Sequence, residues 1–425
     1  MDTIDLKLAQ ECESLAVAAS EGVAWLKDGP LARLLAVLDR DGEEARAIGG
    51  AVRDSLLGKT PHEIDVATTA LPAEVIRRAE AAGFKAVPTG IDHGTVTVVI
   101  AGYPIEVTTL REDVETFGRK ANVRFGRDWK ADAERRDFTI NALSVSADGM
   151  VHDYVGGLAD LAARRVRFIG EPAKRIAEDF LRILRFFRFH ARYGDDVPDA
   201  DGLHAAIVAR DGLELLSRER IRMELMKLLT APHAVPTLVI MAETGILVKV
   251  LGGVPLLASM SNMAKLEAAL GLDADPVRRL GALGVFVVED ADRLRQRLRL
   301  FNAEHERLAA MADAWWRVDP ATVEQGGRAL LYRLGPVHFV DRVLLAWSRT
   351  PSGVADGVWR ELATLPQRWT APKFPLKAAD LTKRGVPKGP RLGAALRAAE
   401  DAWIAQDFPL EADALREIAE RAAQS

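Results

Sequence analysis

The chain has 425 residues, a formal net charge of −4 and 48% hydrophobic residues. This length suggests roughly two to four domains, and the apolar content is ample for buried cores. The single cysteine, Cys12, excludes an intramolecular disulfide and a cysteine-rich zinc site and favours a reducing, cytoplasmic compartment. No apolar run reaches membrane-spanning length, so we expect no membrane association. The negative charge argues against a protein that coats nucleic acids generically, but it allows RNA binding through a local basic face.

After a helical N-terminal extension, the first chemical pattern begins with a short apolar strand, 45–48, that leads into Gly49 and Gly50. Paired glycines allow close backbone approach, and the start of the helix that follows offers free N–H groups to a phosphate. The next strand carries Glu63 and Asp65, two residues apart, so both carboxylates project from one face. A phosphate site beside two carboxylates that can hold Mg²⁺ is typical of nucleotidyl transfer. The alternatives are a tight turn and a solvated strand edge.

A β-hairpin is predicted next, and it carries a third carboxylate. Val96, Val98 and Ile100 recur at every second position, a turn falls at 101–102, and the following strand contains Glu106. Glu106 can lie beside the first two carboxylates and help to hold metal ions for an attacking 3′ hydroxyl and a leaving pyrophosphate. The alternative is an edge-strand charge that discourages pairing with another sheet.

The segment 134–141 combines arginines with a carboxylate and an amide. Arg135 and Arg136 have the guanidinium geometry that suits triphosphate oxygens. Asp137 and Asn141 can together accept from and donate to ribose hydroxyls. The alternative is a helix terminus whose charges pair with each other.

A helix is expected over 178–189. At helical spacing Glu178, Arg182, Arg185 and Phe189 share a face, with Asp179 at its edge. Asp179 and Arg182 are one turn apart, so their charged groups can lie side by side. Cytosine and adenine each offer an amino donor next to a ring-nitrogen acceptor, whereas guanine and uracil present the opposite order. Such an Asp–Arg pair would accept C and A and reject G and U; the alternative is an ordinary intrahelical salt bridge.

Together these segments resemble the class II tRNA nucleotidyltransferase and bacterial poly(A) polymerase family, within the polymerase-β-like nucleotidyltransferases. Their order and spacing match the family pattern over about half of the chain. The matching segments are GGAVRD (49–54), EIDVAT (63–68), HGTV (93–96), IEVTTLR (105–111), RRDFTINAL (135–143), DYVGGLADL (153–161), EDFLRILR (178–185) and RERIRMELMKLL (218–229).

The resemblance implies an α+β fold, with a polymerase-β-like nucleotidyltransferase head followed by an all-helical neck, body and tail. Strands recur to about residue 150, and the pattern is helical from about residue 157 onward. The expected domains are an N-terminal helical extension (1–30), the head (31–155), a neck with the base-selecting helix (156–232), a body (233–317) and a tail that contacts tRNA (318–425).

The resemblance also implies roles for individual residues. Glu63, Asp65 and Glu106 correspond to the catalytic carboxylates, with Mg²⁺ as cofactor and Glu63 and Asp65 as its ligands. The family usually has D-x-D where this chain has Glu63-x-Asp65, and the longer glutamate arm can still reach a metal. The implied nucleotide-binding residues are Gly49, Gly50, Arg53, Arg136, Asp137, Asn141, Glu178, Asp179, Arg182 and Arg185.

The expected activity is addition of CMP and AMP, from CTP and ATP, to the 3′ end of tRNA, with no obligate protein partner. Poly(A) polymerases of the family typically carry a basic, disordered C-terminal tail and an arginine-rich stretch at the position of 91–95. Here the C-terminal EADALREIAERAAQS is helical in pattern and mixed in charge, which favours CCA addition. Poly(A) synthesis, addition of only A or only CC, and a catalytically silent RNA-binding relative remain as alternatives.

A basic cluster near the C-terminus is the predicted RNA contact. Lys383, Arg384, Lys388 and Arg391 lie among glycines and prolines, an arrangement that suits a phosphate backbone. The alternative is a helix–loop–helix with solvated charges.

Overall fold

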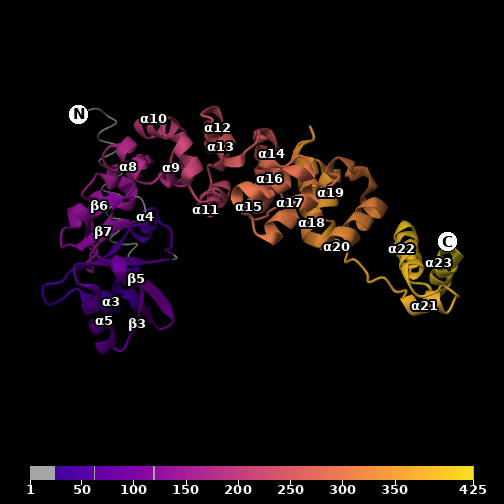
Figure 1. The fold of residues 1–425 in the computed structure, drawn as a ribbon, viewed down its shortest axis with the longest axis horizontal. Helices are drawn as coiled ribbons and strands as arrows, with labels where there is room; N and C mark the ends of the chain where they lie inside the picture. The colour runs from indigo at the N-terminus through magenta and orange to yellow at the C-terminus, as the bar shows by residue number, and fades with distance from the viewer. Residues whose placement is uncertain (1–23, 62, 118–119, 425) are drawn as a thin grey trace. The chain divides into compact units, whose positions relative to one another are not determined.

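The computed structural model describes residues 24–61, 63–117 and 120–424. The chain forms two compact units, Met1–Val250 and Leu251–Ser425 (Figure 1). The predicted N-terminal extension, 1–30, and Cys12 lie outside the described residues, except for 24–30, which include helix α2 (Ala24–Lys27). No helix in the described ranges is both long and apolar enough to cross a membrane.

The strands all lie in the first unit. They are β1 (Ala45–Ile48), β2 (Asp65–Thr68), β3 (Lys85–Gly90), β4 (Thr95–Ile100), β5 (Tyr103–Thr109), β6 (Arg111–Phe117), β7 (Lys120–Phe125), β8 (Ser144–Val145) and β9 (Val151–His152). A mixed sheet has the order β3-β4-β5-β2-β1-β8-β9, and β6 and β7 form a separate hairpin. β2 and β5 are parallel neighbours, whereas the other pairs in the sheet are antiparallel. β2 therefore has a hydrogen-bonded neighbour on both sides.

The β4–β5 hairpin confirms the alternation in its sequence. Val96, Val98 and Ile100 are buried, and the residues between them are partly exposed. Ala101 and Gly102 at the turn both have positive φ, 52° and 86°, as a two-residue turn matched to strand twist requires. The second strand of the hairpin, β5, pairs in parallel with β2.

Two helices pack on each other and against the sheet (Figure 1). They are α3 (Pro30–Leu38) and α5 (Pro72–Ala81). α3 buries Leu31, Leu34, Leu35 and Leu38, the spacing of one helical face. Removing this apolar face from water stabilises the sheet domain.

The connection from β1 into α4 (Gly50–Leu56) follows the predicted strand–glycine–helix pattern. Gly49 has φ 68° and ψ −124°, a backbone conformation that other residues rarely adopt. Gly50 has no such constraint, because an added Cβ would meet its nearest atom, on Arg53, at 3.5 Å. The expectation that Glu63 lies on the second strand is wrong: β2 begins at Asp65, and Glu63 lies in the bend before it.

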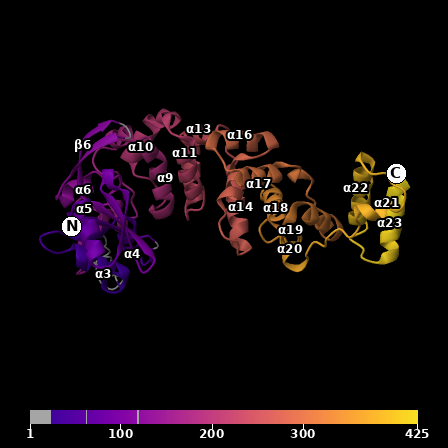
Figure 2. The ribbon, with the colours of Figure 1, turned by 60° about the horizontal axis from the view of Figure 1, so that its bottom comes forward.

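The chain becomes helical after β9, as predicted. The further α-helices of the first unit are α6 (Trp129–Glu134), α7 (Gly157–Ala162), α8 (Pro172–Glu178), α9 (Leu181–Tyr193), α10 (Ala200–Val208), α11 (Arg218–Leu229), α12 (Ala234–Glu243) and α13 (Ile246–Leu251), the last at the boundary between the units. α9 and α11 pack side by side (Figure 2). The sheet-to-helix change falls near the predicted head–neck boundary, and the domain limits themselves remain predictions.

The expected continuous helix over 178–189 is interrupted. α8 ends at Glu178, Asp179 has an extended backbone, and α9 begins at Leu181. The Asp179 carboxylate accepts from the Leu181 N–H at 3.1 Å, a local bond that competes with helix continuation. The ring of Phe180 lies against Gly212, where an added Cβ would come within 2.1 Å of it. The break turns Asp179 away from the face that its sequence position predicts.

The second unit is helical throughout its regular structure. Its α-helices are α14 (Leu257–Ala269), α15 (Pro276–Gly284), α16 (Val288–Leu298), α17 (Asn302–Ala312), α18 (Arg328–Ser348), α19 (Gly357–Ala363), α20 (Leu365–Arg368), α21 (Ala378–Thr382), α22 (Pro390–Ala405) and α23 (Ala412–Gln424). Trp403 is fully buried in the core of the last three helices. The C-terminal segment is helical, as predicted.

Candidate active site

Two carboxylates lie opposite each other on neighbouring parallel strands. Asp65, the first residue of β2, is in register with Glu106 on β5, so both side chains project from the same face. Burial of its surroundings and the charge of Glu106 raise the pKa of Asp65, whereas the charge of Arg136 opposes this effect. Arg136 is itself held by Asp132 at 3.0 Å. A carboxylate whose neighbours disfavour its charged form is suited to a cation that relieves the repulsion.

Glu63 contributes to the same edge although it lies outside the strand. Glu63 and Asp65 line one cavity, and the Glu63 charge also raises the pKa of Asp65, after burial and Glu106. Within the described part of the chain, no group of three or more His, Cys, Asp or Glu side chains could by itself hold a metal. The carboxylates nevertheless fit Mg²⁺, which is usually bound by one or two carboxylates together with waters and substrate phosphates.

The cavity beside these carboxylates has a volume of about 380 Å³. Further parts of its lining come from α9 and α11, which contribute Arg188, Arg192, Tyr193 and Lys227. These four residues are not among the site residues predicted from the sequence. The four-residue spacing of Arg188 and Arg192 was an available signal for one helix face. Their approach to the carboxylates depends on packing between segments that are far apart in the chain.

Arg53 joins the sheet domain to α9. Its side chain is buried and donates to the Asn141 Oδ1, to the Tyr193 hydroxyl at 2.6 Å and to the Asp54 carboxylate at 3.0 Å. The guanidinium also lies 4.0 Å from the centroid of the Tyr193 ring, within cation–π range. A buried guanidinium with this many partners holds α4 and α9 in a defined relation.

The two predicted ribose-binding residues lie together. Asp137 Oδ1 accepts from the Phe138 N–H at 2.9 Å and from Asn141 Nδ2 at 3.0 Å, while Oδ2 accepts from Arg185 Nε at 2.7 Å. Burial would raise the pKa of Asp137, but the Arg185 charge and these hydrogen bonds hold it below its usual value. Asp137 is therefore ionised, and it orients both Asn141 and Arg185.

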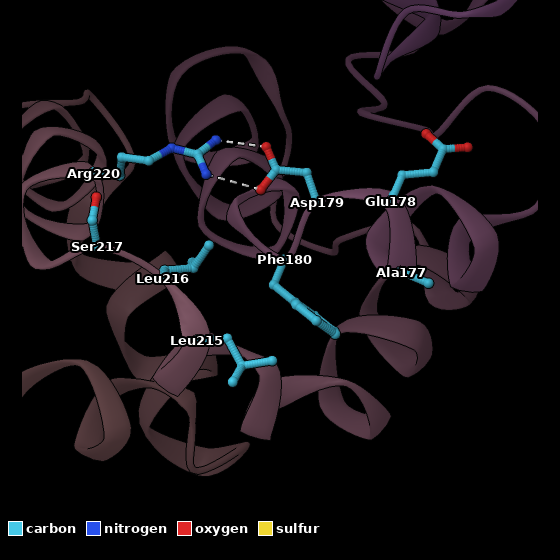
Figure 3. A pocket seen from close by; sticks show the side chains of 8 residues that line it. All are labelled: Ala177, Glu178, Asp179, Phe180, Leu215, Leu216, Ser217 and Arg220. Atoms are coloured by element: carbon cyan, nitrogen blue, oxygen red, sulfur yellow. Dashed lines mark hydrogen bonds and ion pairs between the residues drawn. The ribbon is translucent and has the colours of Figure 1, made fainter. Parts of the chain in front are cut away.

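The base-selecting residues have partners that the sequence did not predict. Arg182 donates to the Glu178 carboxylate and to the Arg175 carbonyl, the latter at 2.7 Å. Asp179 accepts two hydrogen bonds from Arg220 on α11, at 2.6 and 3.2 Å (Figure 3). Asp179 is thus held by Arg220, and Arg182 is held by Glu178. These contacts take the place of the simple salt bridge that was expected between Asp179 and Arg182. Arg220 could have been suspected only from its place in RERIRMELMKLL.

Three of the basic tail residues, Lys383, Arg384 and Lys388, lie between α21 and α22, and Arg391 lies in the first turn of α22. Lys383, Arg384, Lys388 and Arg391 are all exposed. Arg384 donates to the Asp380 carbonyl at 2.8 Å. Within the described residues, none of the four forms an ion pair with a carboxylate. Their charges are therefore available to a phosphate backbone.

Comparison with known proteins decides the family. Residues 45–167 match the model described as the poly A polymerase head domain, and residues 205–260 match one described as a probable RNA and SrmB-binding site of polymerase A. The chain is 34% identical to the CCA tRNA nucleotidyltransferase 1, mitochondrial, of Mus musculus over 400 residues, which cover 91% of this chain and 88% of the relative. The chain belongs to the CCA-adding tRNA nucleotidyltransferase family.

Other members show the same extent of similarity. The CCA-adding enzyme of Latilactobacillus sakei is 31% identical, over 91% of this chain and 96% of its own length. The crystal structure of the Bacillus stearothermophilus CCA-adding enzyme in complex with CTP is similar with a TM-score of 0.73 at 29% identity, over 92% of this chain and 96% of that one. The predicted family, fold class and tRNA nucleotidyltransferase activity are confirmed. The roles of individual residues remain predictions.

Proposed function

We propose that this enzyme adds CMP and AMP, from CTP and ATP, to the 3′ end of tRNA without a nucleic-acid template and releases pyrophosphate. The observation that carries the proposal is the in-register pair of Asp65 and Glu106, with Glu63 beside it at the edge of a cavity. Glu63 and Asp65 would hold Mg²⁺, and Glu106 adds negative charge next to them. When bound, Mg²⁺ promotes deprotonation of the attacking 3′ hydroxyl and neutralises charge on the leaving pyrophosphate.

The incoming nucleotide is held by the surrounding residues. Gly49 and Gly50 let the backbone at the start of α4 approach the triphosphate. Arg136, which already acts on Asp65 by its charge, supports the same phosphates. Asn141, oriented by Asp137, contacts the ribose.

Base choice depends on the residues around the α8–α9 break. The Asp179 carboxylate accepts from the amino group of cytosine or adenine, and Arg182 donates to the adjacent ring nitrogen. Uracil and guanine would place acceptor against acceptor and donor against donor, which leaves desolvated polar groups unpaired. Arg53 and Arg185 hold this neck region against the head through Tyr193, Asn141 and Asp137.

The tRNA substrate makes a second contact, with the basic residues of the tail. The exposed charges of Lys383, Arg384, Lys388 and Arg391 suit its phosphate backbone. Because the whole chain carries a net charge of −4, tRNA must be held by local positive surfaces of this kind.

A defined-end assay tests the proposal. The enzyme is mixed with Mg²⁺ and labelled CTP, ATP or both, on tRNA that lacks its last three nucleotides, and the products are sequenced. We expect CC from CTP alone, CCA from both, and no product after chelation of Mg²⁺. Addition of CC only, addition of A only to tRNA ending in CC, or equal extension of poly(A) RNA would each replace the assignment. The absence of any product with Mg²⁺ would indicate a silent relative.

A further inference from the structure

Arg220 has a place in the site that neither the family match nor the predicted site residues assign. It lies in the first turn of α11, and both of its terminal nitrogens donate to the Asp179 carboxylate, at 2.6 and 3.2 Å (Figure 3). The side chains are 30% and 34% exposed, respectively, and line a cavity of about 600 Å³. Ion pairs that are this open contribute little to folding. The more direct consequence of the contact is that it orients the Asp179 carboxylate.

We propose that Arg220 is a positioning residue that aims one oxygen of Asp179 at the amino group of the incoming base. This inference rests on the proposed function of Asp179 in base selection. Arg220 contacts the carboxylate and acts on the base only through it.

The hydrogen bonds of Asp179 identify the oxygen. An ionised carboxylate has two acceptor sites on each oxygen. Oδ1 accepts from the Leu181 N–H at 3.1 Å and from Arg220 Nη1 at 3.2 Å, so both of its sites are used. Oδ2 accepts from Arg220 Nη2 at 2.6 Å and keeps one site. The remaining site on Oδ2 is the acceptor for the amino hydrogen of cytosine or adenine.

The position of Arg220 is itself fixed. Glu224, four residues later on α11, accepts from Arg188 on α9 and lies 3.8 Å from Arg185. Residues four apart on a helix lie on one face, so the same face of α11 contacts Asp179 and also braces α9. Because Arg182 is on α9 as well, this arrangement fixes Arg220 relative to Arg182. The two base-selecting groups are thereby held at a constant spacing.

Loss of Arg220 would leave Asp179 with a different preferred partner. Arg182 and Arg185 also interact with Asp179 through their charges, but Arg185 is already held by Asp137. Without Arg220 the carboxylate can turn toward Arg182, and each group would then occupy the hydrogen-bonding site that the other presents to the base. Selection among bases would fall, whereas contacts to the triphosphate and tRNA would remain.

The test compares Arg220→Ala and Arg220→Lys with the parent and with Arg218→Ala, which removes the same charge from an exposed position on the same helix. The measurement is kcat/KM for CTP against UTP, and for ATP against GTP, in single additions to the appropriate tRNA, together with KM for tRNA and the melting temperature. We expect Arg220→Ala to lower each ratio by roughly 10-fold. Arg220→Lys should recover part of the ratio, because lysine supplies charge without the two-pronged geometry.

Each outcome is decisive. A folded Arg220→Ala enzyme that selects bases like the parent would overturn the proposal, as would a variant that chiefly raises KM for tRNA, which would make Arg220 an RNA contact. If the alanine variant fails to fold, Arg220→Lys decides, since a parental ratio would reject the role and a lowered ratio would support it. If the parent itself adds neither C nor A, the proposed function fails, which is distinguishable from failure of the Arg220 role alone.

Discussion

The head–neck site and the tail turn use positive charge in opposite ways. In the first, guanidinium groups are held by named partners: Arg53 by Asn141 and Tyr193, and Arg182 by Glu178. Between α21 and α22 and in the first turn of α22, the four basic side chains are exposed and form no ion pair with a described carboxylate. Charges with fixed partners have fixed directions, which suits discrimination between similar bases. Exposed charges suit attraction to a polyanion of any sequence.

Under the proposed function, this chain would separate base selection from attraction of tRNA. Selective contacts need desolvated groups whose geometry is set before the ligand arrives. Attractive contacts work through counterion release and need only proximity to phosphates. Substitutions in the two regions should therefore change different measured quantities.

The largest effect is expected at the carboxylate pair. Asp65→Ala should lower nucleotide addition by about 10³-fold or more, because it removes the carboxylate that faces Glu106 and lines the cavity. Binding of tRNA should stay close to that of the parent. Turnover at saturating Mg²⁺ and filter binding of tRNA measure the two quantities. Asp148→Ala, an exposed head carboxylate outside the cavity lining, is the control; full turnover by Asp65→Ala would refute the assignment.

The second-largest effect is expected on the selection of the incoming base. Arg182→Ala should lower the preference for CTP and ATP over UTP and GTP by about 10- to 100-fold, since it leaves the ring nitrogen of the base without a donor. It should affect KM for tRNA much less. The measurement is the ratio of kcat/KM values for paired nucleotides. An unchanged preference would mean that Arg182 serves only its bond to Glu178.

Discrimination between ribose and deoxyribose tests the residues that are held by fixed partners. Asp137→Ala should allow dCTP and dATP to compete about 10-fold better, because Asn141 loses the carboxylate that orients it at 3.0 Å. Asp137→Asn keeps the shape but removes the charge that faces Arg185, so it separates sugar selection from the head–neck ion pair. If discrimination between ribo- and deoxyribonucleotides stays parental in both variants, the motif has another role.

The tail should show a smaller and salt-dependent effect. Replacing Lys383, Arg384, Lys388 and Arg391 by Ala should raise KM for tRNA by roughly 10-fold and reduce the salt slope by about one unit per lost phosphate contact. KM for ATP and the use of a short oligonucleotide ending in CC should not change.

The matched control for the tail is the double variant of Arg416 and Arg421, exposed basic residues of α23 that are paired with Asp413 and Glu417. We expect this control to bind tRNA like the parent. Loss of ATP binding in the quadruple variant, or an equal effect in the control, would remove the tail from tRNA recognition.

The smallest change is expected for Glu63→Asp. If Glu63 is a metal ligand, the shorter carboxylate should keep activity within about 10-fold of the parent. Glu63→Gln, which keeps the length and loses the charge, should be the more damaging variant. Activity against Mg²⁺ concentration measures both, and equal activity of the two variants would show that Glu63 is not a ligand.

Local patterns explain the successes of prediction from sequence. The alternation of Val96, Val98 and Ile100 and the glycine turn after them specify a hairpin within a few residues. The start of β2 is not set by its local sequence. Asp65, its first residue, pairs with Ile48, the last residue of β1. On that side β1 ends at the level of Asp65, so Glu63 lies beyond the end of β1 and outside the strand, although its sequence looks equally suitable. The interruption at Asp179 likewise depended on a side-chain bond to the Leu181 N–H and on the packing of Phe180.

The predicted chemical types and their order could be read from the sequence: carboxylates expected to hold a metal, arginines expected to bind phosphates, and an Asp and an Arg expected to read a base edge. The partners that hold these groups became apparent from the folded structure. Asp179 pairs with Arg220, which lies 41 residues later in the sequence, and Arg53 pairs with Tyr193, which lies 140 residues later. The reason is physical, because covalent spacing sets which side chains share a helix turn or a strand face. The partner of a charged side chain depends instead on which helix packs nearby, and here α11 packs against α9.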